Sequence, residues 1–110
     1  MADVIWTSPA FLLLETLPDK TALELFRRAE MLRAFPKMGA TISGTRTVYS
    51  RYRQLICRKK YRIIYEIDEF DGNAYILIVQ YCKQKLPDPR LFHLRNHVNR
   101  DRCRVYLQGE

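Results

Sequence analysis

Acidic residues are missing from a long central stretch of this 110-residue chain. Between residues 31 and 65 the sequence has nine lysines or arginines and no aspartate or glutamate. The acidic residues concentrate instead in residues 15–30 and 66–71. Together with a net charge of +7, this distribution predicts one basic face and a polyanionic partner, although scattered solvated lysines would give the same sum.

Long apolar runs are also missing, since none approaches the length that spans a bilayer. The N-terminus lacks the basic patch and apolar stretch of a signal peptide. We therefore expect a cytoplasmic protein with no membrane partner. The three cysteines are widely spaced and odd in number, which favours free buried thiols over a disulfide framework.

The N-terminal segment predicts a strand followed by a short helix. Residues 4–7 are β-prone. Ser8 and Pro9 favour a helix start with Ser8 as the N-cap and Pro9 at the first helical position. The residues that follow are strongly apolar, and the helix is expected to end near Pro18.

A second helix is predicted by apolar residues that recur at three- and four-residue steps from Ala22 to Leu32. Thr21 and Glu24 have the spacing of a capping box, and Pro36 stops the helix. Because few residues separate the two helices, they are expected to form an antiparallel hairpin.

The second half of the chain predicts an antiparallel meander. Residues 40–47 read as a loop, and three β-rich runs follow at 49–58, 61–68 and 74–82. Asp71-Gly72 is a strong hairpin-turn signal between the last two runs.

If that dipeptide is the centre of the turn, Ile67 faces Ile76, Tyr65 faces Ile78 and Ile63 faces Gln80. Alternation then predicts a core face of Tyr61, Ile63, Tyr65 and Ile67, with Arg62, Ile64 and Glu66 on the other face. The expected fold is α+β: an N-terminal strand and an antiparallel helical hairpin packed on a mainly antiparallel four-stranded sheet. Residues 1–86 form the main part, and residues 87–110 form a basic C-terminal helix or tail.

Three segments carry a resemblance to a known family. They are Val4–Ala10, Leu32–Gly39 in the pattern L-x-x-F-P-x-M-G, and Tyr61–Ile67, which contains Y-R-I-x-Y. Gly44-Thr45-Arg46 follows the second segment. In order and spacing these segments resemble the RelE/ParE toxins of bacterial type II toxin–antitoxin systems over about residues 3–85.

The resemblance implies a neutralising antitoxin as partner and one of two activities, neither needing a cofactor. RelE-like members cut mRNA on the ribosome as metal-independent endoribonucleases, and ParE-like members poison DNA gyrase. The alternative interpretation from another class is a non-catalytic basic nucleic-acid-binding module, or a decayed toxin.

The same resemblance implies roles for particular residues. Arg62 matches the arginine that supports the transition-state phosphate in RelE-like enzymes, a role that suits the guanidinium fork. Its structural alternative is a surface arginine that pairs with Glu66. Arg51 and Arg53 fall where RelE-like toxins carry strand lysines, and alternation places both on one face. Arg62, Arg53 and Lys83 are the predicted catalytic residues.

Further residues are predicted to bind RNA or the target: Arg46, Arg51, Arg58, Lys59, Lys60, Tyr81 and Lys85. Residues 58–60 fit a merely solvated turn equally well. Gln84 stands near the position of a RelE arginine, and no C-terminal tyrosine clearly matches, so mRNA cleavage and gyrase inhibition both remain open. His93 and His97 have a metal-binding spacing, but no further ligand pair supports it, and no metal site is predicted.

Overall fold

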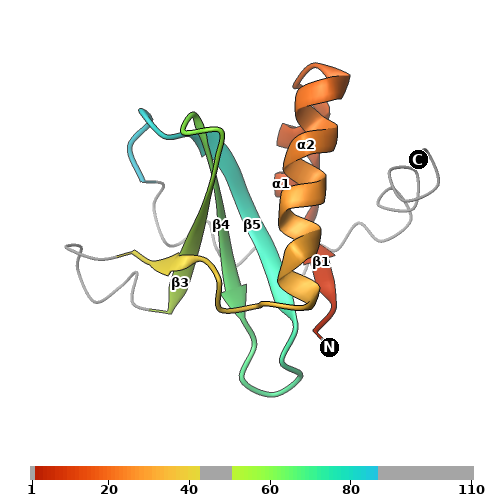
Figure 1. Cartoon of the computed structure of the whole chain (residues 1–110), viewed down its shortest axis with the longest axis vertical. Helices are drawn as coiled ribbons and strands as arrows, with labels where there is room; N and C mark the ends of the chain where they lie inside the picture. The colour runs from red at the N-terminus through yellow and green to blue at the C-terminus, as the bar shows by residue number, and fades with distance from the viewer. Residues whose placement is uncertain (1, 43–50, 87–110) are drawn as a thin grey trace.

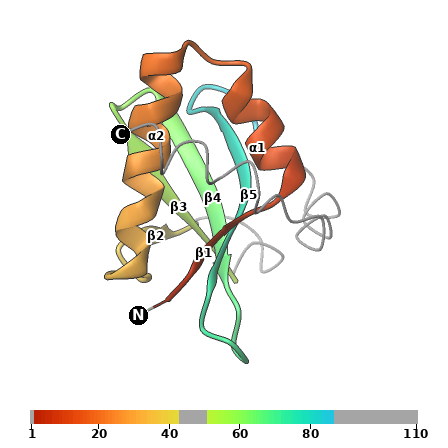
Figure 2. The ribbon, with the colours of Figure 1, turned by 90° about the vertical axis from the view of Figure 1, so that its right-hand side faces the viewer.

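The computed structural model describes residues 2–42 and 51–86, in which two helices cover one face of a five-stranded sheet (Figures 1 and 2). The elements are β1 (Val4–Trp6), α1 (Ser8–Glu15), α2 (Asp19–Glu30), the 3₁₀ turn η1 (Met31–Arg33), β2 (Ala40–Thr41), β3 (Tyr52–Cys57), β4 (Tyr61–Ile67) and β5 (Ala74–Tyr81).

The sheet has the strand order β1-β5-β4-β3-β2, in which β1 runs parallel to β5 and the other neighbours are antiparallel. The predicted α+β class and mainly antiparallel sheet are confirmed. The prediction of four strands was wrong, because β2 forms within the segment read as a loop. None of the described helices is long and apolar enough to cross a membrane. The predicted C-terminal appendage, residues 87–110, lies outside the described residues.

Both helix starts differ slightly from the prediction. Thr7, not Ser8, is the N-cap of α1, and its buried hydroxyl donates to the backbone oxygen of Ile76 at 2.8 Å. This hydrogen bond joins the start of α1 to β5. Pro18 is the N-cap of α2, so the capping box predicted at Thr21 is not formed.

The core lies between the helices and the sheet, as alternation along β4 predicted. Tyr61, Ile63 and Tyr65 are buried on the helix-covered face, with Ile67 partly buried beside them. Ile64 belongs to a second buried cluster on the opposite face. The two faces of β4 are therefore both apolar at their centres, and Arg62 lies on the face away from the helices.

The predicted register of β4 and β5 was wrong. Tyr65 pairs with Ile76 and Ile63 with Val79, with an irregularity between Ile64 and Tyr65. The turn is longer than two residues because the Asp68 carboxylate accepts hydrogen bonds from the backbone N–H groups of Phe70 and Asp71. This side chain closes the loop earlier than the Asp71-Gly72 signal indicates.

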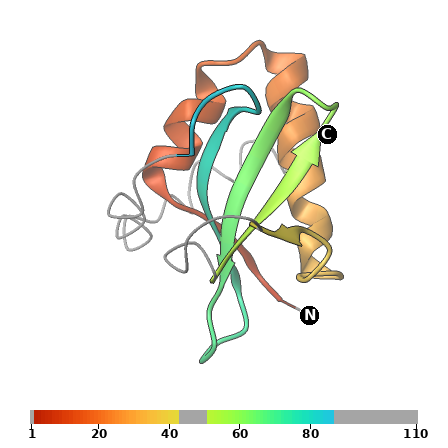
Figure 3. The same cartoon turned by 90° about the vertical axis from the view of Figure 1, so that its left-hand side faces the viewer.

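The two ends of the sheet have different connections between elements (Figure 3). The β4–β5 connection projects at one end, below the sheet in Figure 1. The α1–α2 connection, the β3–β4 turn and the loop after β5 gather at the other, which we call the upper end.

Candidate target-binding site

Arg62 holds the loop that follows β5. Its Nη2 donates to the backbone oxygens of Cys82 at 2.8 Å and Gln84 at 2.7 Å. Its Nη1 lies 3.4 Å from Oε1 of Gln54, and its Nε is buried without a hydrogen-bond partner. Among the described residues these acceptors, and not Glu66, take the hydrogen bonds of the guanidinium. Arg62 therefore joins the middle strand to the loop.

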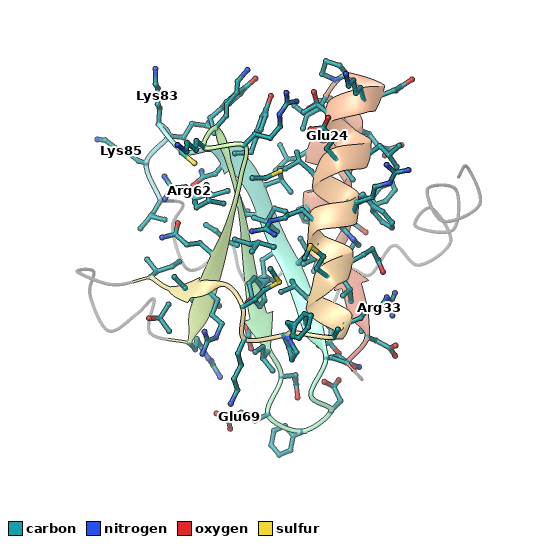
Figure 4. All side chains as sticks on the ribbon, viewed as in Figure 1. Glu24, Arg33, Arg62, Glu69, Lys83 and Lys85 are labelled. Carbon is teal, nitrogen blue, oxygen red and sulfur yellow. The ribbon has the colours of Figure 1, made fainter. Side chains whose placement is uncertain are left out.

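The loop held by Arg62 presents two exposed lysines. Lys83 lies between the two carbonyl groups that Arg62 binds, and Lys85 follows (Figure 4). A second contact, from Nε2 of Gln80 to the backbone oxygen of Lys85 at 3.2 Å, fixes the end of the loop. The structure therefore brings Arg62, Lys83 and Lys85 together at the upper end.

Arg53 lies on the opposite face of the sheet from Arg62. It pairs across β3 and β4 with Tyr65, whose side chain faces the helices. Its Nη1 donates to the backbone oxygens of Gly39 at 2.7 Å and Lys37 at 3.3 Å. Arg53 and Arg62 therefore do not converge on one phosphate, and the predicted single basic face is divided between two sides of the sheet.

The motif that ends at Gly39 has a packing role that the sequence did not reveal. The hydroxyl of Tyr65 donates to the backbone oxygen of Pro36 at 2.7 Å and accepts from the N–H of Gly39 at 3.0 Å. A Cβ at Gly39 would lie 2.7 Å from the Tyr65 ring and hydroxyl. Burial raises the pKa of the Tyr65 hydroxyl. Two of the three family segments thus meet in one contact.

Arg51 and Arg53 border the same groove, as alternation predicted for residues of one face. The groove holds about 550 Å³ and is also lined by Lys37, Glu66 and Glu69. Its lining carries both signs of charge, so it is not a cationic channel for a polyanion.

The β3–β4 turn contributes the remaining basic residues of the upper end. Arg58 and Lys59 are exposed and have positive φ values of 58° and 57°. Arg58 forms an ion pair with Glu24 of α2 at 3.0 Å, so its charge is partly neutralised. Lys59 is exposed beside it.

Lys60 and Tyr81 form an aromatic and cationic cluster with Tyr61. The Lys60 ammonium lies 5.5 Å from the centre of the Tyr61 ring and 5.8 Å from that of Tyr81. The two rings are 4.8 Å apart. Tyr81 pairs with Tyr61 and shares the helix-covered side, so it does not lie on the face of Arg62.

Arg46, a predicted target-binding residue, lies outside the described residues. So do His93 and His97, for which no metal site was predicted. Among the residues that the structure describes, no three His, Cys, Asp or Glu side chains are grouped to hold a metal ion.

Three comparisons relate this geometry to known proteins. Residues 4–86 match the family model described as ParE toxin of type II toxin-antitoxin system, parDE. Because this match covers most of the chain, the chain belongs to the ParE toxin family, and it is the toxin of a type II toxin–antitoxin system within the RelE/ParE superfamily. A search of curated proteins gave no match.

Solved structures similar to this chain have the RelE fold. The RelBE2 toxin–antitoxin complex from Mycobacterium tuberculosis has 24% identity and a TM-score of 0.62, covering 76% of this chain and 93% of that one. The isolated RelE toxin from E. coli has 11% identity and a TM-score of 0.62, covering 77% and 88%. The intact E. coli RelBE complex has 13% identity and a TM-score of 0.61, covering 76% and 100%.

Proposed function

We propose that this toxin arrests growth in the ParE-like way, by binding and poisoning DNA gyrase, and that it does not cut mRNA. The observation that supports this most is the set of hydrogen bonds made by the two predicted catalytic arginines. Arg53 donates through Nη1, and Arg62 donates through Nη2, to backbone carbonyl groups, and the two side chains lie on opposite faces of the sheet.

Cleavage of RNA by its own 2′-hydroxyl needs groups that converge on one phosphate. A preorganised donor acts only when it points at the place where charge develops. Arg53 points at the loop before β2, and the lysine neighbours of Arg62 extend from the loop into solvent (Figure 4). Binding to a protein target makes no such demand, since an exposed charged surface is sufficient for recognition and steering.

The exposed residues of the upper end are those we expect to meet the target. They are Lys59, Lys60, Tyr81, Lys83 and Lys85. Tyrosine is favoured at protein interfaces because one ring offers both apolar area and a hydroxyl. Lysines around it favour approach to an acidic partner surface at low ionic strength.

Ribosome-dependent mRNA cleavage is the second candidate. The proximity of Lys83 and Lys85 to Arg62 favours it, because these three cations lie on one loop and its anchoring strand. In this arrangement the lysines, and not the arginine, would be the groups that reach the phosphate.

Two assays on the wild-type toxin separate these candidates. We expect purified toxin to block supercoiling by DNA gyrase in proportion to its concentration, and to leave mRNA intact on ribosomes whose A site contains an mRNA codon but no tRNA. Toxin with Lys83 and Lys85 both changed to Ala is expected to inhibit gyrase less strongly, while Arg51→Ala serves as a control on the mixed-charge groove. Cleavage of mRNA by the wild type, with unaffected supercoiling, would overturn the proposal in favour of the second candidate.

The toxin is also proposed to have a cognate antitoxin, as two of the similar structures are toxin–antitoxin complexes. Expression of the toxin alone is expected to arrest bacterial growth, and co-expression of the protein encoded beside it is expected to restore growth. Normal growth at high levels of folded toxin would contradict this.

A further inference from the structure

Gln80 lies directly opposite Arg62 in the sheet. The two residues are Cα partners in the pairing of β4 with β5, so their side chains project from the same face, the one away from the helices. Arg62 donates to the backbone oxygens of Cys82 and Gln84. Nε2 of Gln80 donates to the backbone oxygen of Lys85 at 3.2 Å. Two neighbouring side chains therefore hold three carbonyl groups of one loop.

The three carbonyl groups divide the two exposed lysines between Arg62 and Gln80. Both acceptors of Arg62 flank Lys83, whereas Gln80 holds the carbonyl group of Lys85 itself. Lys83 and Lys85 extend from the loop in different directions (Figure 4). Because the backbone position of a lysine determines where its ammonium group can reach, Arg62 places Lys83 and Gln80 places Lys85.

The position of Gln80 has an unfavourable feature that needs an explanation. Its Oε1 is buried without a hydrogen-bond partner in the described part of the chain, and so is Nε of Arg62 on the paired strand. A buried polar atom without a partner destabilises a folded protein, and folded proteins contain few of them. Both side chains are therefore oriented by the loop that they hold and not by a hydrogen bond to each other.

We propose that Gln80 is a positioning residue of the target-binding surface and that it acts through Lys85. Its amide N–H fixes the backbone at Lys85, so that less freedom is lost when the lysine side chain meets the target. The Gln80 side chain needs no contact with the target, since its Nε2 is used by the loop and its Oε1 is buried. This role rests on the proposed function, in which Lys85 is expected to contact gyrase.

The test is a double-mutant cycle on the full-length toxin, measured as the concentration that half-inhibits supercoiling by gyrase. Gln80→Met keeps an unbranched side chain and removes the donor, so it is expected to raise that concentration about three- to tenfold, the size of losing one hydrogen bond. In a Lys85→Ala background the same change is expected to have less than about a twofold effect, because Gln80 acts through Lys85. In a Lys83→Ala background its full effect is expected to remain.

Gln54→Met is the matched control, because Gln54 lies on the same face, on the other side of Arg62. Its Oε1 lies 3.4 Å from Nη1 of Arg62, and no hydrogen bond joins its side chain to the described residues of the loop. This variant is expected to change inhibition less than about twofold. If Gln80→Met fails to fold by circular dichroism, Gln80→Glu replaces it, since a carboxylate keeps the shape of the side chain and cannot donate to the Lys85 carbonyl group.

Three results would overturn the proposal: unchanged inhibition by the folded Gln80 variant, its full effect in the Lys85→Ala background, or an equal loss in Gln54→Met. A wild type that arrests growth but spares gyrase would count against the proposed function alone. The same cycle is then measured as the level of toxin expression that arrests bacterial growth, with the same pattern expected among the variants.

Discussion

Arg53 and Arg62 stand on neighbouring strands, but each guanidinium reaches a different loop on a different face of the sheet. Arg53 reaches the segment between η1 and β2, where Gly39 and Tyr65 are already packed together. Arg62 reaches the loop after β5, which continues into exposed lysines.

This difference separates an architectural region from a recognition region. The Arg53 region, which consists of Pro36–Gly39, Arg53 and Tyr65, turns most of its polar groups inward. The Arg62 region consists of Arg62 and the loop 82–86. Its lysines are exposed, and hydrogen bonds from Arg62 and Gln80 hold the backbone of the loop. Arg53 therefore stabilises a packed loop, and Arg62 holds a loop whose lysines are exposed.

The largest expected effect comes from filling the space at Gly39. Gly39→Ala places a methyl group 2.7 Å from the Tyr65 ring, and it is expected to lower the free energy of unfolding by about 1–3 kcal/mol. Urea unfolding followed by circular dichroism measures this. A double variant with Tyr65→Ala removes the ring and leaves the backbone oxygen of Gln54 2.9 Å from the added Cβ, so it should show a smaller penalty for Gly39→Ala. An unchanged urea midpoint for Gly39→Ala would mean that the Arg53 region is not tightly packed.

Removing the Tyr65 hydroxyl tests the same region by pH. Tyr65→Phe leaves the buried N–H of Gly39 without its acceptor, and is expected to cost about 1–3 kcal/mol at neutral pH. Because burial raises the pKa of Tyr65 above its ordinary value of about 10, the folded state favours the neutral phenol. That stabilisation is present below about pH 10 and is lost as the pH rises through the folded-state pKa.

The wild type is therefore expected to lose stability above about pH 10 more steeply than Tyr65→Phe. Burial also raises the pKa of Cys57, but this thiol is present in both proteins, so the difference between their curves isolates Tyr65. Parallel stability curves between neutral and alkaline pH would contradict the account.

A smaller effect is expected at the upper end, in the β3–β4 turn. Lys59 has a φ of 57°, which costs a residue with a side chain about 1 kcal/mol. Lys59→Gly is expected to raise the free energy of unfolding by about that amount. Lys59→Ala removes the charge but keeps the strain, so it should give no gain. An equal rise in both variants would assign the effect to charge and not to the backbone.

Structural features that depend only on residues close together in the sequence were predicted correctly. Alternation along Tyr61–Ile67 gave the correct core face, because the period of a strand is local. The register failed because Asp68 caps its own loop, and because β5 has an irregularity opposite Ile64 and Tyr65. The two-residue strand β2 had no pattern long enough to recognise.

The site was harder to predict than the fold. Arg62 and Arg53 were predicted as catalytic residues, but the backbone carbonyl groups that accept their hydrogen bonds lie in loops 14–22 residues away in sequence. No local sequence pattern predicts which carbonyl groups will accept hydrogen bonds from a guanidinium. The pairing of Tyr65 with Gly39 is similar, although both residues lay in segments that resemble the family.

The most direct test of the division between the two regions is native-state hydrogen exchange of Arg53→Ala and Arg62→Ala. Loss of Arg62 is expected to speed exchange in the loop 82–86 and to leave Lys37–Gly39 protected. Loss of Arg53 is expected to do the reverse, because each guanidinium fixes only its own segment. Unchanged exchange in the loop 82–86 of Arg62→Ala, or faster exchange in both segments of either variant, would contradict the account.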